Sequence, residues 1–151
     1  MSILDVKNDV SYCVGGFGEG LDHPECITWG SDGYAYAGGE GGQIYRIDVE
    51  NNHFEQFAQA PNFVGGLCQD GSGSLYICSG NKVYKTDNDG NLTEYSVGTP
   101  DVAMIGPNYP AFDKNGNLYV TDSGEWKKDN GKIFKISPGG QTEVWSELPN
   151  T

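Results

Sequence analysis

The residues best suited to chemistry are polar side chains that directly follow a proline. Four such positions recur at similar intervals, namely Glu25, Asn62, Asn108 and Asn150. Their prolines are 37, 46 and 42 residues apart. Carboxylate and amide oxygens are the ligands that Ca²⁺ prefers, but the same residue types also cap loop backbone and fit turns. His23, two residues before Glu25, could join such a site or be an ordinary loop residue.

These positions recur because the chain itself repeats. In each copy a tyrosine lies three residues after a turn glycine, at Tyr36, Tyr76 and Tyr119. Each copy also has an aliphatic, an aromatic and a basic residue in succession. These triplets are 44–46, 83–85 and 133–135. Asp-Gly and Asn-Gly pairs separate the short alternating segments, as they do in β-hairpins. The sequence therefore predicts several copies of one antiparallel unit.

The length of the repeat predicts an all-β fold, the β-propeller. A unit of about 40–50 residues with four strands is typical of a propeller blade. We expect a single domain, 1–151, that is a half-propeller of three four-stranded blades. Its parts are a strand segment at 1–18 and blades at roughly 19–60, 61–106 and 107–151. A β-sandwich built from the same strands is the alternative, although a sandwich needs no sequence register between hairpins.

A half-propeller has consequences for assembly. Propellers typically have four to eight blades, and their innermost strands face a central channel, so equivalent side chains form a ring. Three blades alone would leave the flat faces of the terminal blades in water, and such an apolar patch marks an interface. We therefore expect a homodimer that closes one six-bladed ring about a two-fold axis.

The charge balance limits the possible partners. Nine Lys and Arg residues against 21 Asp and Glu residues give a formal net charge of −12. Nucleic acid and anionic membrane both require a basic patch, so we expect neither as a partner. An acidic surface favours cations such as Ca²⁺, although it can equally serve solubility alone.

The cysteines and the N-terminus bear on the compartment. The four cysteines are Cys13, Cys26, Cys68 and Cys78, and no pair has the spacing of a zinc or redox motif. We interpret them as buried thiols in a reducing environment. No stretch approaches the roughly 18 apolar residues of a membrane span, and the N-terminus lacks the pattern of a signal peptide. The sequence therefore predicts a cytoplasmic protein.

Two segments carry a resemblance to a known family. Residues 107–124, PNYPAFDKNGNLYVTDSG, are similar to the blade signature of the regucalcin, gluconolactonase and luciferin-regenerating-enzyme-like six-bladed propellers. Residues 20–25, GLDHPE, resemble the first blade of that family, whose Glu binds a metal. The resemblance covers the first half of such a propeller. It implies Glu25 and Asn108 as ligands of a divalent metal, with Ca²⁺ favoured and Zn²⁺, Mn²⁺ or Mg²⁺ possible.

The resemblance leads to two functional hypotheses. The first is a metal-dependent hydrolase that opens lactones or esters in the central channel. Asn62, His23, Asp122 and Asn150 would then line the channel around the substrate. The second is a non-catalytic half-propeller that binds a small molecule or a protein partner, because the family's Asp base has no counterpart in this sequence.

Overall fold

The computed structural model describes residues 20–148, so the strand segment expected at 1–18 lies outside the described residues. Three antiparallel four-stranded sheets, the predicted blades, follow one another along the chain. Blade one contains β1 (Cys26–Trp29), β2 (Ala35–Gly38), β3 (Gln43–Asp48) and β4 (His53–Gln59). Blade two contains β5 (Val64–Gln69), β6 (Leu75–Ser79), β7 (Lys82–Thr86) and β8 (Leu92–Ser96). Blade three contains β9 (Pro107–Phe112), β10 (Leu118–Asp122), β11 (Gly131–Ile136) and β12 (Thr142–Leu148).

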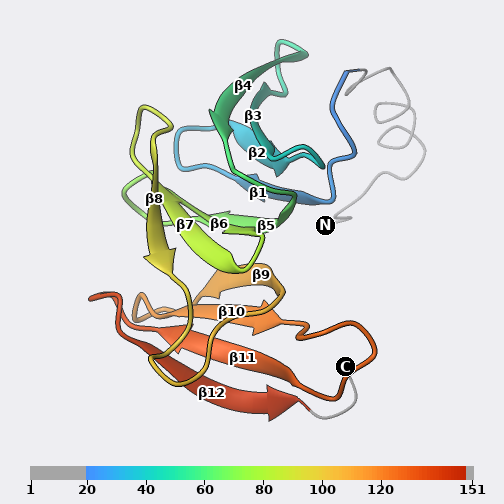
Figure 1. Ribbon diagram of the computed structural model, residues 1–151. Helices are drawn as coiled ribbons and strands as arrows, with labels where there is room; N and C mark the ends of the chain where they lie inside the picture. Colours follow the sequence, from blue (N-terminus) through green and yellow to red (C-terminus); the bar gives the residue numbers. More distant parts are fainter. Residues whose placement is uncertain (1–19, 149–151) are drawn as a thin grey trace, which may run out of the picture.

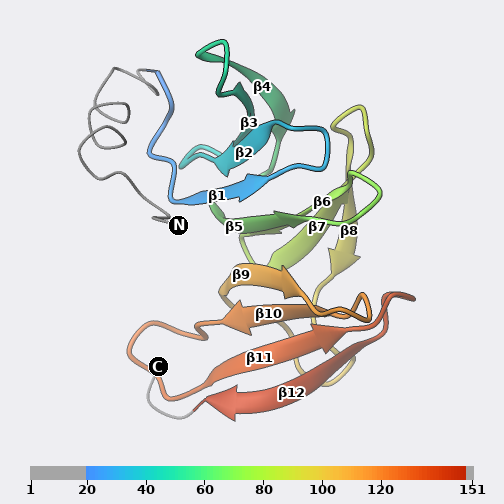
Figure 2. The same ribbon diagram turned by 180° about the vertical axis from the view of Figure 1, so that it is seen from behind.

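The blades stack face to face with their first strands side by side. Figures 1 and 2 show β5 between β1 and β9, and the backbones of these strands are in contact. Glycine permits this approach, because a Cβ at Gly66 would collide with the carbonyl oxygen of Asn108 and one at Gly38 would collide with Val64. None of residues 20–148 belongs to a helix long and apolar enough to cross a membrane.

Each blade has two edges with different connections. The turn edge carries the hairpins β1–β2 and β3–β4 and their equivalents, at 30–34, 49–52, 70–74, 87–91, 113–117 and 137–141. The connector edge carries the approach to β1, the links between blades and the remaining hairpins, at 20–25, 39–42, 60–63, 80–81, 97–106 and 123–130. A residue at the turn edge therefore lies near the hairpin turns of its own blade, and a residue at the connector edge lies near the links between blades.

The turns form where Asp-Gly and Asn-Gly pairs predicted them. Asp113 Oδ1 accepts the backbone N–H groups of Asn115 and Asn117 at 2.8 and 2.9 Å, and Gly116 takes a φ of 80°. Only glycine adopts this left-handed conformation without cost. The side chain of the aspartate thus folds the hairpin that brings β9 and β10 together.

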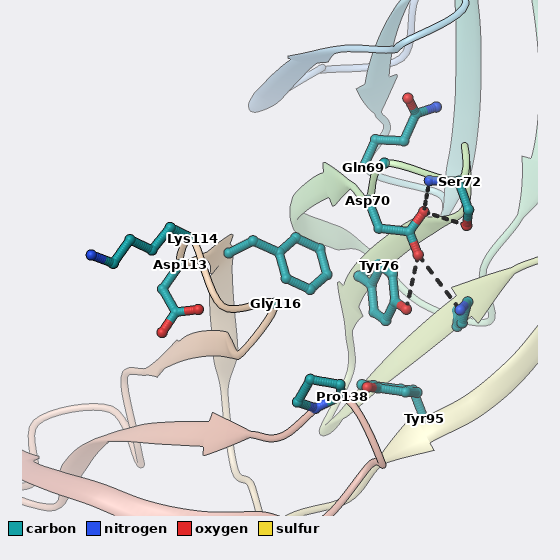
Figure 3. A pocket seen from close by; sticks show the side chains of 12 residues that line it. Gln69, Asp70, Ser72, Tyr76, Tyr95, Asp113, Lys114, Gly116 and Pro138 are labelled. Carbon is teal, nitrogen blue, oxygen red and sulfur yellow. Dashed lines mark hydrogen bonds and ion pairs between the residues drawn. The ribbon is translucent and has the colours of Figure 1, made fainter.

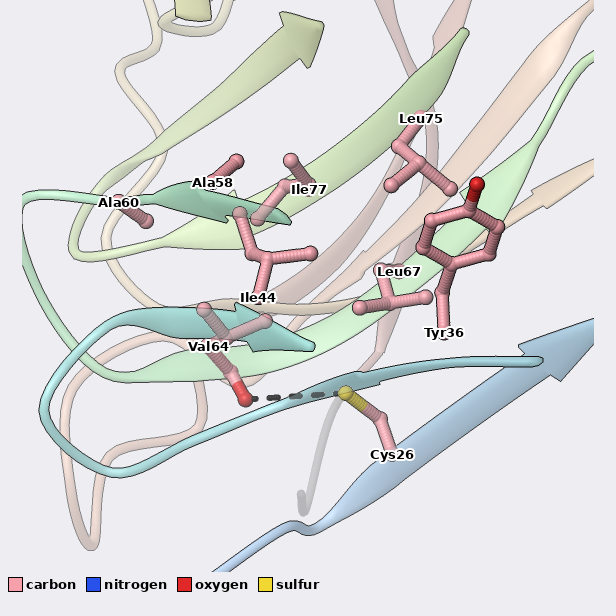
Figure 4. Close-up of a cluster of buried hydrophobic side chains, with 9 residues drawn as sticks. All are labelled: Cys26, Tyr36, Ile44, Ala58, Ala60, Val64, Leu67, Leu75 and Ile77. Atoms are coloured by element: carbon pink, nitrogen blue, oxygen red, sulfur yellow. Dashed lines mark hydrogen bonds between the residues drawn. The ribbon is translucent and has the colours of Figure 1, made fainter. Parts of the chain in front are cut away.

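Two of the three buried clusters lie between blades, and the third, formed by Ala35, Ala37, Tyr45 and Ile47, lies on blade one. Between blades one and two, Tyr36 and Ile44 pack against Leu67, Leu75 and Ile77 (Figure 4). Between blades two and three, Tyr76 and Val83 are buried among the equivalent residues of blade three. The repeated tyrosines and aliphatic residues of blades one and two thus pack between blades. Their equivalents Tyr119 and Ile133 are only partly buried.

Candidate functional site

A pocket of about 350 Å³ opens at the connector edge of blade one. Its described lining is His23, Glu25, Glu40 and Phe63. His23 Nδ1 lies 2.9 Å from Glu40 Oε2 and 3.4 Å from Asp22 Oδ1. Donor atoms of Asp22, His23 and Glu40 all lie within 4.8 Å of one another. The structure therefore brings two predicted site residues, His23 and Glu25, into one acidic pocket.

Local backbone geometry builds this cluster. The N–H of Glu40 donates to the carbonyl oxygen of Asp22 at 3.1 Å, which joins the end of β2 to the approach to β1. The N–H of Gly41 donates to Asp22 Oδ2 at 3.0 Å. This hydrogen bond lowers the pKa of Asp22 below its usual value, so the group is ionised at neutral pH. His23 has a φ of 37°, an uncommon conformation for a residue other than glycine.

Strand pairing shows which residues occupy equivalent positions in the three blades. The repeated tyrosine of each blade faces one residue of the first strand. These facing residues are Thr28, Cys68 and Ala111. Three residues before each of them stand Glu25, Gly65 and Asn108. Counted along the chain from these facing residues, Glu25 of blade one and Asn108 of blade three therefore stand at corresponding positions.

A β-bulge marks this position in blades two and three. In β9, Pro107 faces Asp122 and Tyr109 faces Thr121, which leaves Asn108 as the extra residue. In β5, Gly65 is skipped in the same way. Bulges re-aim side chains and are frequent beside active sites. Asn108 is exposed as a result, although it stands outside the described lining of the blade-one pocket.

Asn62 does not share this position, because it lies three residues before Gly65. Its backbone is held by Ser79 instead. Ser79 Oγ donates to the carbonyl oxygen of Asn62 at 2.7 Å and is 3.2 Å from its backbone nitrogen. The exposed side chain of Asn62 therefore sits in the connector before β5 rather than at the ring position that the Pro-Asn spacing predicted. Asn150 lies outside the described residues.

Asp122 is buried and its carboxylate is occupied by backbone groups. Its oxygens accept the N–H groups of Ile105 at 2.8 Å, Gly106 at 2.9 Å and Gly124 at 2.8 Å. These bonds fix the end of the connector that leads into Pro107 and Asn108. Asp122 thus positions the strand that carries Asn108, a role that the sequence pattern did not indicate.

A second pocket, of about 530 Å³, lies at the turn edge between blades two and three (Figure 3). Tyr76 packs edge-on against Tyr95 and Phe112, with ring centroids 4.8 and 5.0 Å apart. Asp70 Oδ2 accepts the Tyr76 hydroxyl at 3.1 Å and lies 3.6 Å from Lys85 Nζ. None of the residues predicted for the channel is among its described lining.

Sequence reasoning missed Asp22, Glu40 and Phe63. Asp22 and Phe63 are each a single residue away from predicted ones. Glu40 follows the Gly38-Gly39 pair at the end of the tyrosine strand, so an expected β2–β3 hairpin would have placed it at the same edge as His23. That local signal could have found it.

The cysteines do not form part of the site. Cys26 and Cys78 are buried free thiols and Cys68 is half-buried, as expected for structural cysteines. Burial raises the pKa of Cys68 to about 12. Thiols of this kind are protonated at neutral pH and unreactive. Cys13 lies outside the described residues.

Comparison with known proteins identifies the family. Residues 23–149 match the family model described as the SMP-30/gluconolactonase/LRE-like region. The chain belongs to this family. A search among curated proteins gave no significant match.

Solved structures of this fold agree. A gluconolactonase from Xanthomonas campestris is similar over 85% of this chain and 48% of its own, with a TM-score of 0.74 and 15% identity. A putative gluconolactonase is similar over 87% of this chain and 50% of its own, with a TM-score of 0.70 and 14% identity. A streptogramin B lyase is similar over 87% and 42%, with a TM-score of 0.66 and 23% identity. The propeller-blade fold is thereby confirmed, and the chain spans about half the length of these gluconolactonase structures.

Proposed function

We propose that this protein binds a divalent cation at the connector edge of blade one and uses it to hydrolyse a lactone or another ester. The observation that carries the proposal is the pocket in which Glu25 shares a lining with His23, Glu40 and Phe63. Membership of the SMP-30/gluconolactonase/LRE-like family supports it.

The donor groups of this pocket fit a divalent cation. Within the lining, Glu25 and Glu40 offer carboxylate oxygens and His23 offers an imidazole nitrogen. Asp22 lies beside the lining, and donor atoms of Asp22, His23 and Glu40 lie within 4.8 Å of one another. Oxygen ligands suit Ca²⁺ and Mg²⁺, and an imidazole adds affinity for Zn²⁺ or Mn²⁺. Carboxylates predominate in this pocket, so Ca²⁺ is the favoured ion.

The roles of the chain's own residues follow from their positions. Glu25 would hold the ion, and Asn108 would contribute an amide oxygen from the bulge in blade three. Phe63 offers an apolar side on which the ring of a lactone could rest. Asp122, through its three backbone hydrogen bonds, keeps the strand that carries Asn108 in place. A bound cation would polarise the substrate carbonyl and stabilise the negative charge that develops on its oxygen.

A non-catalytic binding module is the second candidate. The observation that favours it is the state of Asp122, whose carboxylate accepts three backbone N–H groups and is not free to take a proton from water. In this case the same pocket would bind a cation or a small molecule without turning it over.

Calorimetric titration with CaCl₂, MnCl₂ and ZnCl₂ tests the metal site. We expect Glu25→Gln to lower Ca²⁺ affinity at least about tenfold, since it removes one charged ligand and each 1.4 kcal/mol is a factor of ten. Glu50→Gln is the matched control, because Glu50 is an exposed glutamate in the turn after β3. Unchanged affinity in Glu25→Gln would refute the assignment. Hydrolysis of a sugar lactone, followed by acid release with and without metal, then separates the two candidates: metal binding without turnover favours the module.

A further inference from the structure

The turn-edge pocket of about 530 Å³ lies between blades two and three, and residues of both blades form its walls. A volume of about 300–1,000 Å³ is typical of sites that bind small molecules. Three aromatic rings and a proline contribute apolar surface to its lining. They are Tyr76, Tyr95, Phe112 and Pro138 (Figure 3). The pocket therefore offers a flat ligand several rings to pack against.

The polar groups that accept hydrogen bonds in this lining are already engaged. Asp70 accepts N–H groups of its own turn through Oδ1 and the Tyr76 hydroxyl through Oδ2. Asp113 accepts backbone N–H groups through Oδ1 and the side-chain amide of Asn117 through Oδ2. The side-chain amide of Gln69 accepts one hydrogen bond and donates another, both with backbone groups of neighbouring turns. A ligand is therefore better held by a donor than by these acceptors.

The repeated basic residue supplies a donor in blade two. In blades one and three this residue forms a salt bridge with the glutamate that faces it on the fourth strand of its blade. The pairs are Arg46–Glu55 and Lys135–Glu143. Lys85 of blade two faces Thr93 instead, and its one ion pair within residues 20–148 is with Asp70, at 3.6 Å. This distance exceeds the roughly 2.7–3.2 Å of an N–H···O hydrogen bond, so the Lys85 ammonium keeps donors for a ligand.

A second difference between the blades explains the size of the pocket. Gln69 and Phe112 occupy equivalent positions at the ends of β5 and β9. The side chain of Gln69 reaches back to blade one, where it accepts the N–H of Ser31, and the pocket between blades one and two measures only about 280 Å³. Phe112 has no polar group with which to form such a bridge and packs edge-on against Tyr76 instead. The space between blades two and three therefore stays open and aromatic.

We propose that this pocket binds a small aromatic carboxylate, whose carboxylate accepts hydrogen bonds from the Lys85 ammonium while its ring packs against Tyr95 and Phe112. The ammonium lies 4.9 Å from the centroid of the Tyr76 ring, so the positive charge stands beside the aromatic wall. The pocket is at the turn edge and the proposed cation site is at the connector edge, so either proposal can fail without the other.

The charges and rings of the pocket select this class of ligand. Hydrogen bonds between an ammonium and a carboxylate are about twice as strong as those between neutral groups. Asp70 and Asp113 would repel a second negative charge, so a carboxylate suits the site better than a phosphate. Tyr76 already packs edge-on against two rings, and a further aromatic ring can pack in the same way.

Titration with sodium benzoate, followed by the NMR shifts of backbone amides, tests the site in the wild-type chain. We expect benzoate at millimolar concentration to shift amides of the turns 70–74 and 113–117. Benzyl alcohol lacks the charge and cyclohexanecarboxylate lacks the aromatic ring, so each should bind at least about fivefold more weakly. Absence of shifts in these turns, or equal affinity for either of the two analogues, would overturn the proposal.

Variants of the basic position test the role of Lys85. Lys85→Met should lower benzoate affinity at least about tenfold, because it removes the ammonium. Thr93→Glu gives Lys85 the facing carboxylate that the other two blades have, so it should also lower the affinity while the walls stay intact. Arg46→Met, at the equivalent position of blade one, is the matched control and should bind as wild type does.

The comparison of these variants decides the assignment. Unchanged affinity in either Lys85→Met or Thr93→Glu, or an equal loss in Arg46→Met, would overturn it. Circular dichroism checks that each variant folds. If Lys85→Met did not fold, Thr93→Glu would decide alone, because Thr93 is exposed and its replacement leaves the lining unchanged.

Discussion

The turn edge and the connector edge of the three blades differ in how strictly they repeat. At the turn edge of blades one and two, a tyrosine hydroxyl donates to an aspartate in both cases, from Tyr36 to Asp32 at 2.7 Å and from Tyr76 to Asp70 at 3.1 Å. A basic side chain faces each tyrosine across the strand pair, Arg46 in blade one and Lys85 in blade two.

The connector edge is different in each blade. Three residues beyond the repeated tyrosine stand Gly39, Ser79 and Asp122. Gly39 has no side chain, Ser79 holds the backbone of Asn62, and Asp122 holds three backbone N–H groups. The cation-type cluster of Asp22, His23 and Glu40 occurs at this edge of blade one. The turn edge thus repeats the features that form a blade, whereas the polar side chains at the connector edge differ from blade to blade.

The largest expected effect tests the repeated edge. Tyr36→Ala and Tyr76→Ala should each cost about 3 kcal/mol or more of unfolding free energy, because both rings are buried between blades. Tyr119→Ala should cost only about 1 kcal/mol, because its ring is partly exposed. Urea denaturation measures all three, and equal costs would contradict the difference in burial between Tyr119 and the other two rings.

A smaller effect tests the connector edge. Asp122→Ala leaves the N–H groups of Ile105, Gly106 and Gly124 without their acceptor, which should cost about 1–3 kcal/mol. Ser79→Ala removes one hydroxyl and should cost about 1 kcal/mol. Amide hydrogen exchange should accelerate at Ile105 and Gly106 in the first variant only. If both variants lost the same unfolding free energy and exchanged the same amides faster, the connector edges of blades two and three would not differ in role.

The smallest effect concerns acid stability at the turn edge. Hydrogen bonds from the side chains of Asn91 and Asn117 lower the pKa values of Asp87 and Asp113. In the unfolded chain an aspartate titrates at about 3.9, so these carboxylates stabilise the fold above that pH. The contribution is lost as the pH falls through their lowered folded pKa values.

Asp113→Asn should therefore show a shallower loss of stability below about pH 4 than wild type does. Urea denaturation at stepwise lower pH measures the slope. Asp129→Asn, at an exposed aspartate of the 123–130 connector, should leave the slope unchanged. An Asp113→Asn protein with the wild-type slope would contradict the role given to these turns.

Much of the fold could be predicted from the sequence because its signals are local. The turn glycine three residues before Tyr36, Tyr76 and Tyr119 fixes a hairpin, and alternation fixes which side chains face the next blade. The exposure of Tyr119 and Ile133 follows from the same reasoning, since no described blade covers them.

The site was less predictable, because the pairing register of the strands and the contacts between distant connectors depend on the whole sheet. Asn62 follows a proline just as Asn108 does, yet the strand pairing and the bulge at Gly65 place it three residues away from the equivalent position. Glu40 reaches His23 only because a backbone hydrogen bond joins two segments that are distant in the sequence. Asp122 looked like a channel residue by its type, but its three N–H partners come from connectors that no periodic pattern describes.

The reactivity of the buried thiols should depend on how often neighbouring blades separate. Cys26 lies in the cluster between blades one and two and Cys78 in the cluster between blades two and three, and burial raises the pKa of both. An alkylating reagent can reach either sulfur only during a transient opening of its own interface. Alkylation rates resolved by peptide mass would therefore report the opening equilibrium of each interface separately, without an engineered cysteine.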